Sequence, residues 1–107
     1  MTAGDFIVAL TTLGDPAQAR QLVQRLVDQR LIACGTILPG AASVYRWQGK
    51  VREEAEVVVL LKTPMARWDA LKAAVEAHHP YQVPELLALP VVAGLERYLD
   101  WVSSETS

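Results

Sequence analysis

Two long extended segments joined by a tight turn constrain this chain more than any other feature. The first runs from Leu31 to Trp47 and the second from Lys50 to Lys62, with Gln48-Gly49 as a two-residue hairpin turn between them. Each arm of about 13 residues reaches roughly 43 Å, whereas a sphere with the radius of gyration expected for this length is only about 34 Å across. The hairpin tip is therefore predicted to overhang its own domain.

The overhanging tip predicts that the chain assembles with copies of itself. An isolated hairpin end is marginally stable in water, and its unpaired edge is a template for another chain. A bend or bulge is expected at Pro39-Gly40, because proline cannot donate to a strand ladder. Beyond the mixed, charged start of the second arm, Val57 to Leu61 is wholly apolar, as in a strand covered on both faces. We therefore expect a closed homo-oligomer.

The segment before the hairpin predicts a strand followed by an amphipathic helix. Phe6 to Thr12 is apolar and β-branched. Asp15 is a good N-cap and Pro16 suits the first helical position. Apolar residues then recur at helical spacing over about four turns; they are Ala19, Leu22, Val23, Leu26 and Val27.

The segment after the hairpin repeats this pattern. Thr63-Pro64 is expected to open a second helix that ends before Pro80. Its predicted inner face consists of Trp68, Leu71 and Val75. A last strand is expected over about Glu85 to Val91. After Gly94, a short helix is predicted to place four residues on one side, namely Leu95, Tyr98, Leu99 and Val102.

The resulting order, β-α-β-β-α-β with a C-terminal helix, predicts an α+β fold of the ferredoxin-like kind. In this sandwich, two helices cover one face of a four-stranded antiparallel sheet. The other face of the sheet then has no cover from this chain. A length of 107 residues allows one domain, which we assign to residues 1–107.

Composition excludes several classes of function. The net charge of -2 argues against a nucleic-acid binder, and one cysteine excludes an internal disulfide and every CxxC motif. No apolar run is long enough to cross a membrane, and the first residues lack the pattern of a signal peptide. A cytoplasmic location is therefore expected. No nucleophile–base pair or phosphate loop is visible, so the chain is not expected to be an enzyme.

The adjacent His78 and His79 are the first candidates for metal ligands, since imidazole suits copper, nickel and zinc. In the alternative interpretation, His78 is the polar end of the second helix's inner face, and His79 interacts with carbonyls at the helix C-terminus. Cys34 is the second choice of ligand, as a soft donor or redox-sensitive thiol. A lone cysteine in a strand more often behaves as a small buried hydrophobe.

Acidic and aromatic side chains around the hairpin form a second set of candidates. Glu53, Glu54 and Glu56 could supply oxygen ligands for a hard cation, or form the solvated face of the return arm. Alternation places Glu54 and Glu56 on one side of the strand and Glu53 on the other. The aromatic residues are predicted interface anchors, with a small-molecule pocket as the alternative; they are Tyr45, Trp47, Tyr81 and Trp101.

Several segments together resemble the CutA family of divalent-cation tolerance proteins over nearly the whole chain. They are Leu31-Ile32-Ala33-Cys34, Ile37 to Ala41, Ser43 to Lys50, Lys62-Thr63, His79 to Glu85 and Tyr98 to Trp101. The resemblance implies a ferredoxin-like subunit in an interlocked homotrimer that pairs strands between subunits through the long hairpins. It also implies a role in copper and divalent-metal tolerance, with no established catalytic activity.

The resemblance also implies two functional hypotheses. In one branch of the family, copper ligands are assigned to the histidine pair and a first-strand cysteine; His78 and His79 match the pair, but Thr11 occupies the cysteine position. Without a thiolate, Cu(II) or Zn(II) is favoured over Cu(I). The first hypothesis is a cytoplasmic, trimeric, divalent-metal-binding protein. The second, from the likeness of CutA trimers to nitrogen-regulatory PII proteins, is a module that binds a small effector or partner protein between subunits.

Overall fold

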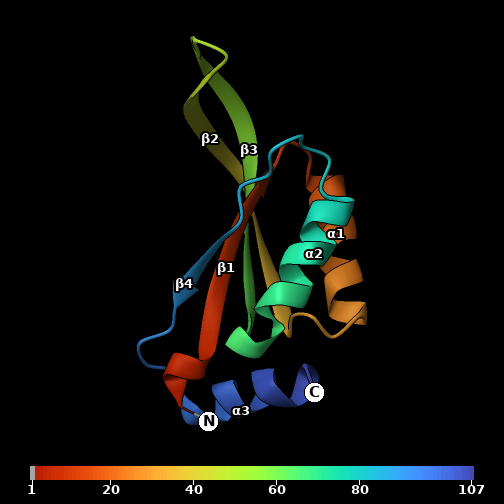
Figure 1. Ribbon diagram of the computed structural model, residues 1–107, viewed down its shortest axis with the longest axis vertical. Helices are drawn as coiled ribbons and strands as arrows, with labels where there is room; N and C mark the ends of the chain where they lie inside the picture. The colour runs from red at the N-terminus through yellow and green to blue at the C-terminus, as the bar shows by residue number, and fades with distance from the viewer. Residues whose placement is uncertain (1) are drawn as a thin grey trace.

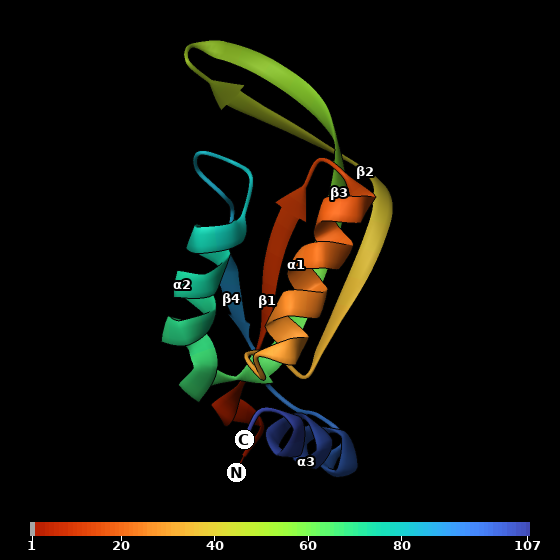
Figure 2. The same cartoon turned by 90° about the vertical axis from the view of Figure 1, so that its right-hand side faces the viewer.

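The computed structural model describes residues 2–107 as a four-stranded sheet with helices on one face, as Figures 1 and 2 show. Met1, which belongs to the predicted domain 1–107, lies outside the described residues. The strands are β1 (Phe6–Leu13), β2 (Cys34–Trp47), β3 (Lys50–Pro64) and β4 (Leu87–Pro90), and the α-helices are α1 (Pro16–Asp28), α2 (Trp68–His78) and α3 (Glu96–Glu105). Two short 3-10 helices span Ala3–Asp5 and Met65–Arg67.

The sheet has the order β2-β3-β1-β4, and every neighbouring pair is antiparallel. Helices α1 and α2 lie side by side on one face, while α3 lies across one end of the sheet (Figure 2). The predicted α+β, ferredoxin-like arrangement is confirmed.

Helix α1 begins as the sequence predicts. The Asp15 side chain accepts a hydrogen bond of 3.0 Å from the backbone N–H of Ala17, and Pro16 is the first helical residue. The inner face of α1 packs closely against β2: a Cβ added at Gly35 would lie 2.7 Å from Cγ1 of Val23. Only glycine allows this approach of strand and helix.

The second helix begins later than predicted. Thr63 and Pro64 belong to β3, where Pro64 pairs with Phe6, and the α-helix starts at Trp68. The reason is that the fully buried Thr63 hydroxyl donates to the carbonyl of Leu31, at 2.7 Å, instead of capping a helix. The predicted inner face is otherwise correct, because Leu71 and Val75 are fully buried.

Three other boundaries differ from the predictions. Strand β4 is shorter than Glu85 to Val91, because only Ile7 to Leu10 of β1 pair with it. Strand β2 begins at Cys34 rather than at Leu31. In α3, Val102 is buried and Leu99 partly buried beside Phe6 and Ala33, but Leu95 and Tyr98 are exposed. The predicted apolar side of this helix is thus only half buried by the protomer.

The hairpin overhangs the rest of the sheet, as predicted. Strand β1 pairs with β3 only from Val57 to Pro64, so the distal half of the hairpin pairs only with itself. Gln48 and Gly49 both have positive φ, 51° and 81°, as a type I′ turn requires. The expected bulge lies between Leu38 and Ala41, where Gly40 has φ of 85°. Beyond it the hairpin is not straight: it bends over the segment between α2 and β4 (Figure 2).

The sheet face opposite α1 and α2 is largely apolar, with Lys62 and Thr36 as polar members, and no helix of residues 2–107 covers it. Register neighbours share this face, as in the row Leu10, Leu60 and Leu87. Leu87 and Leu89 of β4 are 56% and 47% exposed there. Within residues 2–107, no helix is both long and apolar enough to span a membrane.

Candidate functional site

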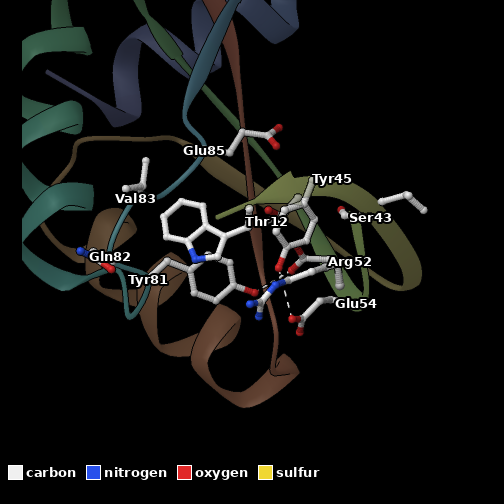
Figure 3. Close-up of a pocket in the computed structure, with 12 residues that line it drawn as sticks. Thr12, Ser43, Tyr45, Arg52, Glu54, Tyr81, Gln82, Val83 and Glu85 are labelled. Atoms are coloured by element: carbon white, nitrogen blue, oxygen red, sulfur yellow. Dashed lines mark hydrogen bonds between the residues drawn. The ribbon is translucent and has the colours of Figure 1, made fainter. Parts of the chain in front are cut away.

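The bend of the hairpin borders an open cavity of about 540 Å³ between the distal parts of β2 and β3 and the segment that follows α2. Thr12, near the end of β1, also lines it. Figure 3 marks with dashed lines the hydrogen bonds that the Tyr81 and Tyr45 hydroxyls make inside it. The lining residues are Thr12, Ser43, Val44, Tyr45, Trp47, Arg52, Glu54, Glu56, Tyr81, Gln82, Val83 and Glu85.

Two tyrosine–glutamate pairs hold the polar side of the cavity. The Tyr81 hydroxyl donates to Oε2 of Glu56 at 2.7 Å, and the Tyr45 hydroxyl donates to Oε1 of Glu54 at 3.2 Å (Figure 3). Glu56 is only 7% exposed, although it follows a charged, exposed stretch of the same strand. Alternation along β3 places both carboxylates on one side of the strand, as predicted, and in the structure this side faces the cavity.

The two phenols are proton donors at neutral pH. Desolvation, followed by the hydrogen bond to Glu56, raises the pKa of Tyr81 far above its ordinary value. Partial desolvation and the bond to Glu54 also raise the pKa of Tyr45. Because both hydroxyls keep their protons, the carboxylates act as acceptors, and the cavity offers negative charge beside aromatic rings.

His79 anchors the segment that closes the cavity. Its ring donates from Nε2 to the backbone carbonyl of Thr12 at 2.8 Å and accepts at Nδ1 from the backbone N–H of Tyr81 at 3.1 Å. The His79 and Tyr81 rings meet edge to face, with centroids 4.8 Å apart. These two bonds require the Nε2–H tautomer, and burial, which lowers the pKa of His79, favours the neutral ring. His79 thereby fixes Tyr81 over the end of β1.

The two histidines differ in environment. His78 ends α2 with its side chain exposed, whereas His79 is 8% exposed in an extended conformation. The alternative interpretation of the pair expected His78 on the inner face; the structure buries His79 instead, because the chain leaves the helix before Pro80. Both ring nitrogens of His79 are already bonded to backbone groups.

The other predicted metal donors do not gather at the histidines. Thr11 is fully buried, and its hydroxyl has no hydrogen-bond partner within residues 2–107. Cys34 lies elsewhere on the sheet, with Sγ 3.7 Å from Nζ of Lys62. Across residues 2–107, no three His, Cys, Asp or Glu side chains form a group that could hold a metal ion. The donor set of one protomer therefore does not fit a complete metal site.

Of the four predicted aromatic anchors, the structure brings three together. Tyr45, Trp47 and Tyr81 line the cavity, while Trp101 lies on α3, half exposed, with its ring centroid 5.8 Å from that of Tyr98. The participation of Thr12 was not predicted. The alternation of polar and apolar residues along β1 does not indicate that Thr12 lines a cavity. Its contact with the cavity depends on the bend of the hairpin.

Comparisons with known proteins agree on one family. The family model described as "CutA1 divalent ion tolerance protein" matches residues 7–105. A divalent-cation tolerance protein CutA from Citrobacter koseri is 45% identical over 98 residues, which cover 92% of this chain and 85% of the relative. A solved CutA structure from Synechococcus elongatus has a TM-score of 0.95 at 37% identity, covering 100% of this chain and 95% of the other. For a divalent cation tolerance protein from Thermus thermophilus, the TM-score is 0.92 at 44% identity, with 95% and 99% covered.

Proposed function

This chain belongs to the CutA1 divalent ion tolerance protein family, and from this premise we propose that it is a non-catalytic, cytoplasmic homotrimer that binds divalent metal ions and so contributes to metal tolerance. The match of the family model over residues 7–105 carries the proposal. Relatives that are 44–45% identical to this chain over 98 residues are named for divalent-cation tolerance, and the name indicates no catalysed reaction.

Two features of the protomer support assembly with copies of itself, as the proposed homotrimer requires. One is the apolar sheet face opposite α1 and α2, where Leu87 and Leu89 are about half exposed. The other is the distal half of the hairpin, whose strands have no partner beyond each other. Contact between copies of the chain would bury the first and pair the second, which removes apolar surface and open strand edges from water.

His78 is the donor that we assign to a bound Cu(II) or Zn(II). Its imidazole is exposed, whereas ligation by His79 would break a hydrogen bond to Thr12 or from Tyr81. His79 then serves as a positioning residue that fixes the chain next to His78. Further donors would have to come from other protomers or from water, because the described part of one protomer offers no group of three.

Titration of the full chain with Cu(II) and Zn(II), followed by calorimetry, tests the metal proposal. His78→Ala should abolish stoichiometric binding, while Cys34→Ala, which removes the second-choice donor, should leave it unchanged. His79→Ala should weaken binding only as far as it disturbs the fold, which circular dichroism measures in parallel. If His78→Ala binds both metals as the unaltered chain does, the proposed site is wrong.

The cavity under the hairpin favours a second candidate function, a PII-like module that binds a small effector. Its volume of about 540 Å³ and its mixture of aromatic and polar lining are typical of small-molecule sites. A thermal-shift screen of nucleotides and metabolites tests this candidate. Stabilising compounds should lose their effect when Tyr81→Ala opens the cavity, and a screen without stabilising compounds would remove the candidate.

A further inference from the structure

Within residues 2–107, no cationic side chain forms an ion pair with the carboxylate of Glu56. Its side chain is 7% exposed and accepts, within residues 2–107, one hydrogen bond, from the Tyr81 hydroxyl. Across the described residues, the one ion pair joins Arg30 to Glu105 and does not involve Glu56. Burying a carboxylate without a counter-charge is costly, and proteins normally place a cation beside it. This unpaired charge lines the cavity rather than the core.

The rest of the cavity lining also favours a positively charged ligand. Glu54 and Glu85 add two carboxylates, against the single positive charge of Arg52. Three aromatic residues, Tyr45, Trp47 and Tyr81, complete the wall, and aromatic faces attract cations that have shed their water. A cavity with these properties discriminates against anions.

We propose that this cavity binds an organic cation, whose ammonium or guanidinium-type group pairs with Glu56 while its apolar part packs against the three aromatic rings. This inference rests on the second proposed function and names the ligand class for it. A planar fork of N–H donors suits this carboxylate, because Oε1 has no donor within residues 2–107 and Oε2, which accepts from Tyr81, keeps a second lone pair for the bidentate contact. A metal ion fits less well, since no group of three donor side chains lies within residues 2–107.

Benzamidine and benzamide form a matched pair of probes, because they differ in charge but hardly in shape. We expect isothermal titration of the full-length oligomer to show benzamidine binding at least about tenfold more tightly than benzamide, as a charge-assisted contact requires. Glu56→Gln should reduce benzamidine affinity to that of benzamide, since glutamine keeps the acceptor for Tyr81 but not the charge. Glu53→Gln, one of the three neighbouring glutamates but outside the cavity, is the control and should change nothing.

Trp47→Leu keeps the cavity apolar but removes one ring, and it should weaken benzamidine binding several-fold. Equal affinity for the two probes, no benzamidine binding at millimolar concentration, or unchanged binding in Glu56→Gln would overturn the inference. Displacement of benzamidine by Zn(II) in the unaltered protein would identify a metal as the occupant of the cavity. That result would also overturn the inference. If a nucleotide or other anion binds instead and Tyr81→Ala abolishes its binding, the effector function stands and only the cationic class is refuted.

Discussion

Replacing His79 with alanine should destabilise the protein strongly, whereas the same change at His78 should not. His79→Ala removes the donor to the Thr12 carbonyl and the acceptor for the Tyr81 N–H, at 2.8 and 3.1 Å. Each bond contributes about 1 kcal/mol net, and more when the partner left behind is buried. The edge-to-face contact with Tyr81 contributes about another 1 kcal/mol. The expected loss in the free energy of unfolding is about 3 kcal/mol, against less than about 0.5 kcal/mol for the exposed His78.

Urea denaturation at a fixed protein concentration, followed by intrinsic fluorescence, measures this difference. The pH dependence adds a second readout, because the pKa of His79 is lowered from 6.5 in the folded chain. Above pH 6.5 the ring of His79 is neutral in both the folded and the unfolded chain. As the pH falls below 6.5, the unfolded chain takes up the proton first, so the free energy of unfolding falls. His79→Ala should lack this part of the acid loss. Equal destabilisation by the two alanine variants, or an unchanged pH profile in His79→Ala, would refute the reasoning.

Three further predictions follow from single contacts. Tyr81→Phe leaves the buried Glu56 carboxylate without its donor and should lower the free energy of unfolding by about 1–3 kcal/mol, measured by urea denaturation with Tyr98→Phe as the control. Gly40→Ala has open space around the new methyl group but a φ of 85°, so strain alone should cost about 1 kcal/mol, visible as a lower thermal midpoint. Leu87→Glu places a charge on the open sheet face; light scattering should find three times 11.7 kDa for the unaltered protein and a smaller mass for this variant.

Local chemistry made much of the fold predictable from the sequence. Asp15 and Pro16 specify the start of α1 through groups next to each other in the chain, and Gln48-Gly49 specifies the turn through its own backbone preferences. The overhang of the hairpin followed from arm length alone. Where a residue's partner is distant in sequence, local preferences do not predict its structure. Thr63 has the appearance of a helix cap, yet the carbonyl of Leu31 takes its hydroxyl and keeps it in the strand.

The candidate site divides in the same way. The sequence shows which residue types are present: the histidine pair, the three glutamates and the aromatic residues near the hairpin tip. Their roles were not separable, because His78 and His79 are neighbours in sequence but occupy opposite environments. Only the position of Pro80 relative to the end of β1 directs one imidazole inward, to the Thr12 carbonyl, and leaves the other in solvent.

The sequence by itself therefore determined the order of elements, the long hairpin and the family, since these depend on periodicity, turn residues and motif spacing along the chain. The tertiary structure alone decided that the bent hairpin lies over the segment after α2, that a cavity forms between them, and that Glu56 and Tyr81 meet there. The physical reason is that a bend of a few residues moves side chains 25 positions apart into hydrogen-bond contact, and such a meeting leaves no periodic trace in either segment.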